Sequence, residues 1–178
     1  LLLNLWLIPD QPNLSPLELT LKAWGAYAGD SLGPHVMESI ATHIRRIAPP
    51  NTPLAALESL AMQVILSSQS IFDPRNAREW VKSFEVADPK PEGEIEETKP
   101  KKGKKNQNVV PTPTSGLLAK MAVSGLLDTY PNHKMRFSHL VFAGFLAGHA
   151  FSHYNAEEAI LNQPDWSGKY LAMRYFAA

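Results

Sequence analysis

The sequence has no cysteine among its 178 residues. This absence excludes disulfide bonds, thiolate metal ligands and a cysteine nucleophile, and it fits a reducing compartment. An excess of one charge is also missing, because 17 basic and 17 acidic side chains give a formal net charge of zero. Proteins that bind polyanions through bulk charge usually carry a clear positive excess, so the overall balance argues against a generic nucleic-acid binder.

Long apolar runs are lacking as well. The opening segment LLLNLWLIPD is interrupted by Pro9, and the apolar run over residues 140–151 is also short. A bilayer span needs about 20 apolar residues, and a secretory signal needs a basic region and a small-residue cleavage site. We therefore expect a soluble, intracellular protein without a membrane span. The chain begins at Leu1 rather than methionine, which favours a fragment or a processed product.

Common enzyme motifs are absent too. The sequence contains no GxGxxG, no Walker lysine loop and no GxSxG elbow, which are the short motifs that carry phosphate-binding and serine-hydrolase chemistry. We expect no cofactor, and the absence of these motifs favours a protein that is not an enzyme.

Helix signals dominate what is present, in a composition that is 44% hydrophobic. The residues SPLE at 15–18 form a capping box with proline at the first helical position. An apolar stripe with spacings of four and three predicts an amphipathic helix, and its members are Leu32, Val36, Ile40, Ile44 and Ile47. We find no convincing strand pair.

These signals predict an all-α fold of about eight helices. The expected helices cover residues 16–28, 32–48, 53–65, 74–84, 116–128, 139–153, 156–162 and 168–176. Ser138 is the expected cap of the helix at 139–153, and Asn155 that of the helix that follows. The eight helices fall into an N-terminal half (1–86) and a C-terminal half (115–178). Whether the two halves form one bundle or two stays open. The apolar ends at residues 1–8 and 170–176 predict surfaces that another half or another subunit completes.

Residues 87–114 separate the halves and are rich in proline, glutamate and lysine. Such a segment buries too little apolar surface to offset its ordering entropy, so we interpret it as a flexible linker or arm. Its lysines form the tract KPKKGKK, which resembles a localisation signal or a polyanion-binding tract, and the tract leaves a nuclear location open. The lysines are Lys99, Lys101, Lys102, Lys104 and Lys105.

The segment GFLAGHAFSHYNAEE carries the one pattern that resembles chemistry. His149 and His153 are four residues apart and project from the same side of a helix, as a metal pair requires. Glu157 would follow on that face in a straight helix, but Asn155 has the character of a helix cap, and a turn there would remove the glutamate. Two alternatives to a metal site remain, namely a structural helix edge with hydrogen-bonded rings, and acid-base or pH-sensing chemistry. His35 and His43 repeat the spacing, and there we favour a solvated edge.

Gly144 and Gly148 lie on one face of the same helix. Each glycine costs about 1 kcal/mol relative to alanine in a helix interior, so the pair predicts that something large or close packs there. A bulky ring from another helix is the first expectation, and a bound ligand is the alternative.

A basic stripe on the helices is the remaining candidate site. Phosphate contact would be independent of base sequence and sensitive to salt, and the folded candidates are Arg45, Arg46, Arg75 and Arg78. From these features we expect a non-enzymatic assembly subunit of a protein or nucleoprotein complex, coat-like or nucleoprotein-like, with the linker as a basic arm. The alternatives are a metal- or ligand-binding helical enzyme centred on His149 and His153, and a regulatory adaptor with a lysine-rich docking tract.

Overall fold

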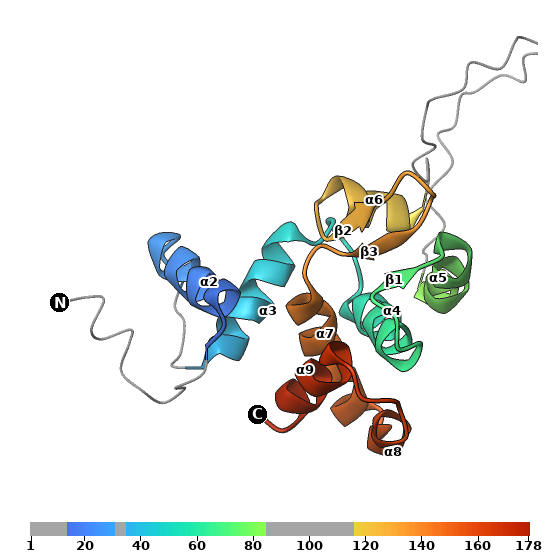
Figure 1. The fold of residues 1–178 in the computed structure, drawn as a ribbon. Coiled ribbons are helices and arrows are strands. Elements are labelled where there is room, and N and C mark those ends of the chain that lie inside the picture. The colour runs from blue at the N-terminus through green and yellow to red at the C-terminus, as the bar shows by residue number, and fades with distance from the viewer. Residues whose placement is uncertain (1–13, 31–34, 85–115) are drawn as a thin grey trace, which may run out of the picture.

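The computed structural model describes residues 14–30, 35–84 and 116–178, and these residues are mostly helical (Figure 1). The helices are α2 (Pro16–Tyr27), α3 (Val36–Ile47), α4 (Leu54–Leu66), α5 (Pro74–Val81), α6 (Leu117–Val123), α7 (Leu140–His153), α8 (Glu157–Leu161) and α9 (Ser167–Phe176). A short 3-10 helix over Lys82–Phe84 extends α5, and the strands are β1 (Ile71–Phe72), β2 (Leu127–Thr129) and β3 (Met135–Phe137). The expected helical character is confirmed. The predicted linker, its lysine tract, the apolar opening segment and Leu32 lie outside the described residues.

Local signals set several of the helix ends. The Ser15 hydroxyl accepts a hydrogen bond from the backbone N–H of Glu18, whose side chain accepts one from the N–H of Ser15, as the predicted capping box requires. The side chain of Asp73 caps α5 through the N–H of Arg75, with Pro74 in the first turn. At the other end of α2, Gly29 adopts a left-handed φ of 77° and stops the helix.

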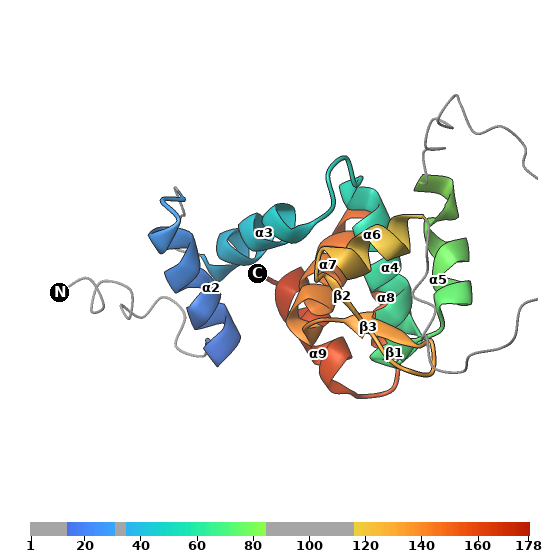
Figure 2. The same ribbon diagram turned by 90° about the horizontal axis from the view of Figure 1, so that it is seen from above.

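Helix α7 lies at the centre of the fold (Figures 1 and 2). Its residues are apolar on nearly all sides, and ten of its fourteen residues are buried, which is typical of a helix surrounded by others. It packs most extensively against α9 and α4. Since α4 comes before residues 85–115 and α7 and α9 come after them, described residues on both sides of that segment share one hydrophobic core.

The structure contains a small antiparallel sheet that the sequence did not predict. The sequence showed no convincing strand pair, and it predicted a helix over residues 116–128. Helix α6 stops at Val123 because Gly125 adopts a φ of 81°, and Leu127 then begins strand β2. The strand order is β1-β3-β2, with Leu127 opposite Phe137 and Phe72 opposite Met135. These four side chains are buried, so the strands form because each contributes apolar side chains to the core. Strand β1 thereby joins the part of the chain before residue 85 to the part after residue 115.

Helix α3 begins at Val36, after the predicted start at residue 32, and the capping residues of α7 and α8 differ from those predicted. Asn155 is the left-handed residue that ends α7, with a φ of 50°, and the N–H of Ala156 donates to the carbonyl of Phe151 across it. It is therefore not the cap of α8, which starts after Ala156. At the other end of α7, His139 rather than Ser138 is the capping residue, because its Nδ1 accepts from the N–H of Val141 at 3.1 Å.

Gly144 and Gly148 lie where α7 approaches α9. A Cβ atom at Gly148 would lie 2.7 Å from the carbonyl oxygen of Ala172 and 2.9 Å from the nitrogen of Phe176. At Gly144 it would lie 2.6 Å from the Cβ of Leu171. The nearest neighbour of Gly148 is thus the backbone of α9, not the bulky ring that we expected. Helix α7 of the same chain thus covers part of the apolar C-terminal segment.

Gly148→Ala should lower the free energy of unfolding by about 1–3 kcal/mol, because the added methyl group meets helix backbone that cannot rotate away. The gain in helix propensity, about 1 kcal/mol, works in the opposite direction. Chemical denaturation measures the difference. Ser152→Ala is the matched control, since Ser152 lies in the same helix with an exposed side chain. A Gly148→Ala protein as stable as this control would show that α7 and α9 do not approach so closely.

Candidate functional site

Helix α2 turns an uncharged face outward. Its exposed residues cover about 160° of the helix circumference at 100° per residue, and they are Pro16, Leu19, Thr20, Ala23, Trp24, Ala26 and Tyr27. Trp24 is 52% exposed and Tyr27 is 91% exposed. The hydroxyl of Thr20 donates a hydrogen bond to the carbonyl of Pro16 in the same helix, at 2.8 Å. We call these seven residues the α2 outer face.

The inner side of α2 carries a buried carboxylate. Glu18 is fully buried, and the hydroxyl of Tyr175 in α9 donates to its Oε1 at 2.6 Å. Arg174 lies 3.1 Å from the same oxygen, and the N–H of Ser15 donates to the other oxygen at 2.7 Å. Because hydrogen bonds and an opposite charge satisfy this carboxylate, the helix can bury its glutamate and expose its aromatic side chains.

The donors around Glu18 decide its ionisation. Burial alone would raise the pKa of Glu18, but the hydrogen bonds from Tyr175 and Ser15 and the charge of Arg174 outweigh burial and hold its pKa below the ordinary value. The same contact acts in reverse on the phenol: burial and the neighbouring carboxylate raise the pKa of Tyr175. At neutral pH the pair is therefore a carboxylate that accepts from a neutral hydroxyl.

A second polar contact fixes α2 to its neighbour. Arg46 of α3 donates from Nη2 to both oxygens of Asp30, at 2.9 and 2.8 Å, just after α2 ends. The two helices also pack against each other, and they lie on one side of α7 in Figures 1 and 2. The α2 outer face is thus presented by a helix anchored at both ends.

The predicted basic residues do not form one stripe. Arg46 is paired with Asp30, whereas Arg45, Arg75 and Arg78 are exposed. The arginines at 45 and 46 lie on α3 and those at 75 and 78 on α5, and α4 lies between these helices in both views (Figures 1 and 2). Any phosphate contact on the described residues would therefore use separate patches.

The two candidate metal ligands, His149 and His153, do share one side of α7. Their rings are nearly parallel, with centroids 6.5 Å apart and an interplanar angle of 13°. Glu58 of α4 lies 2.6 Å from Nδ1 of His149. Its side chain is 6% exposed, against 51% for that of His149. Glu157 begins α8 after the turn at Asn155, and the described part of the chain contains no group of three or more potential ligands arranged around one point.

The other histidine pair differs from the predicted solvated edge. His35 is exposed, but His43 is half-buried, stacks on Phe142 with centroids 5.6 Å apart, and has a buried Nδ1 without a hydrogen-bond partner. Burial, with a smaller contribution from Arg46, lowers the pKa of His43. This ring is part of the contact between α3 and α7.

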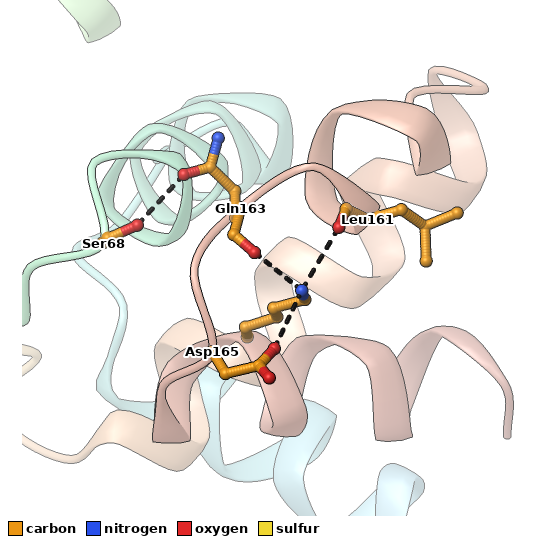
Figure 3. A network of polar contacts seen from close by, with 5 residues as sticks. Ser68, Leu161, Gln163 and Asp165 are labelled. Atoms are coloured by element: carbon orange, nitrogen blue, oxygen red, sulfur yellow. Dashed lines mark hydrogen bonds and ion pairs between the residues drawn. The ribbon is translucent and has the colours of Figure 1, made fainter.

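A buried lysine organises the loop between α8 and α9 (Figure 3). The Nζ of Lys169 donates to the carbonyls of Leu161 and Gln163, at 3.2 and 2.7 Å, and to the Asp165 carboxylate at 3.1 Å. The Gln163 side chain in turn accepts a hydrogen bond from Ser68 at the end of α4, at 3.0 Å. Three oxygen acceptors satisfy the ammonium group, which is a structural arrangement rather than a reactive amine.

Sequence reasoning missed Glu18, Glu58 and Lys169 as buried polar groups. Glu18 was recognised only as the acidic member of a capping box. For Glu18, one signal was available in the sequence. The large apolar side chains of α2 fall on both sides of the helix, so no clear polar face is left for the glutamate.

Lys169→Met should destabilise the protein by about 1–3 kcal/mol, because it keeps the side-chain volume and leaves the carbonyls of Leu161 and Gln163 without their donor. Thermal or chemical denaturation measures the change. Lys82→Met, at an exposed lysine, should have little effect. Equal effects in the two variants would argue against the structural role of Lys169.

Stability should depend on pH through Glu18. Since its pKa is lowered on folding, its contribution is present above the ordinary value of 4.5 and is lost as pH falls through the folded pKa. Tyr175 acts in the opposite sense, and its contribution is lost as pH rises above 10. Glu18→Gln should therefore reduce the loss of unfolding free energy on acidification, measured by denaturation from pH 7 to pH 3. Glu157→Gln, at an exposed carboxylate, is the control and should retain the loss.

Comparison with known proteins adds no family assignment. No protein-family model matches the chain, and no curated protein or solved structure matches it either. Within the described residues no helix is both long and apolar enough to cross a membrane.

Proposed function

We propose that the chain is a non-enzymatic helical assembly subunit that acts through protein–protein contacts, and that the α2 outer face is its contact surface. One observation carries the proposal: the seven exposed residues of α2 include no charged side chain and do include Trp24 and Tyr27. Aromatic side chains are enriched and charged ones depleted in the cores of protein interfaces. Exposed apolar patches of this kind mark interaction sites.

The anchoring of α2 supports the same proposal. The buried Glu18 contacts Tyr175 and Arg174 of α9, and Asp30 contacts Arg46 of α3. A contact surface that is already held rigid loses less conformational entropy when a partner binds. The exposed Trp24 and Tyr27 side chains are thus presented on a helix whose orientation is set before binding.

The partner we propose is a second copy of the chain. A face without charges is best complemented by another face without charges, and a two-fold arrangement places the same surface on both subunits. Helix α2 has 12 residues, which corresponds to a length of about 18 Å. Two such helices bury less area than a stable dimer usually does. We therefore expect reversible association that depends on concentration.

A nucleoprotein form of this role is a further part of the proposal. Arg45, Arg75 and Arg78 are exposed, and they would contact phosphate from separate patches. The lysine tract that would supplement them lies outside the described residues.

Replacing both aromatic side chains tests the proposal. Sedimentation velocity over a concentration series should show self-association of the unaltered chain, and Trp24→Ser with Tyr27→Ser should weaken it at least tenfold, since buried aromatic side chains dominate interface energetics. The control combines Val123→Ser and Tyr170→Ser, which remove two exposed apolar side chains from other helices. A chain that stays monomeric at every concentration, or a control that weakens association equally, would refute the role of α2.

A further inference from the structure

We propose that His149 and His153 form a binding site for a divalent transition-metal ion of the zinc class, with Glu58 as the residue that positions His149. The site lies on α7 and α4 and does not depend on the α2 outer face. The two histidines present the spacing of four residues that lets two imidazoles on one helix reach the same ion.

The contact with Glu58 distinguishes this pair from an ordinary surface pair. Glu58 is nearly buried on α4, and its carboxylate lies 2.6 Å from Nδ1 of His149. A carboxylate only accepts hydrogen bonds, so the proton of a neutral imidazole is held on Nδ1 and the lone pair is left on Nε2. Carboxylates hold metal-binding histidines in this way, and they raise the basicity of the ligand nitrogen.

The second ring lies beside the first. The imidazole of His153 is nearly parallel to that of His149, and the ring of Tyr154 packs edge-on against it with centroids 5.1 Å apart. Both histidine side chains are exposed. An ion can therefore reach the two rings from solvent without a change in the core.

The chemistry of the ligands selects the ion. Imidazole suits zinc, copper and nickel, whereas magnesium and calcium require oxygen ligands. The described residues supply two ligands and no third, so the remaining coordination positions are left to water or to donors from another molecule. A site of this kind is open and exchanges its ion readily, in contrast to a closed structural zinc site with four protein ligands.

Titration of the tag-free chain with zinc tests the proposal. Calorimetry and NMR of the histidine rings detect the binding. We expect saturable binding that shifts the resonances of His149 and His153. His153→Ala should weaken binding at least tenfold, and it leaves the contact between Glu58 and His149 in place. Glu58→Gln should weaken binding about 10- to 100-fold, with the helical circular-dichroism signal retained.

His133→Asn is the matched control, because His133 is exposed on a turn with a φ of 61° that asparagine also tolerates. It should leave zinc affinity unchanged. No saturable binding at millimolar zinc, or equal affinity in the unaltered chain and His153→Ala, would overturn the site. Unchanged affinity in Glu58→Gln would remove the positioning role of Glu58.

Discussion

The close approach of α7 and α9 is the constraint on which the rest of this structure depends. Two glycines on α7 bring the backbone of α9 within a distance that no larger residue allows at Gly148. Helix α9 then carries Tyr175 and Arg174 to the position where they contact Glu18 of α2. The orientation of α2 therefore depends on the close packing of α9 against Gly144 and Gly148 of α7. The exposure of Trp24 and Tyr27 follows from that orientation.

The buried polar groups all depend on hydrogen bonds or ion pairs with other parts of the chain. Glu18, Glu58 and Lys169 each lie in the interior or at its edge, and each is satisfied by partners from another segment. An unpaired group in such a place would cost several kcal/mol, so these contacts also specify how the helices are arranged. They connect α2 to α9, α4 to α7, and the loop before α9 to the helix that follows. Polar contacts thus add directional restraints to a core that is otherwise apolar.

The proposed surface and the proposed metal site both result from this arrangement. The α2 outer face is free because the glutamate, and not the aromatic side chains, turns inward. His149 is oriented because α4 packs on α7 and brings Glu58 to its ring. Both proposed sites lie on helices, the first on α2 and the second on α7 beside α4.

The sequence by itself determined the helical class and most helix ends, because caps, prolines and left-handed glycines act through residues that are neighbours in the chain. Ser15 with Glu18, Asp73 with Pro74, and Gly29 are examples in which the local signal and the structure agree. Strands of two or three residues escaped prediction, because they are too short to show an alternating pattern and because one of their pairings joins Phe72 to Met135 across a long stretch of chain. Only the tertiary structure decided which side of α2 is buried and which carboxylate contacts His149. Both depend on partners from distant segments, and spacing along one helix contains no information about those partners.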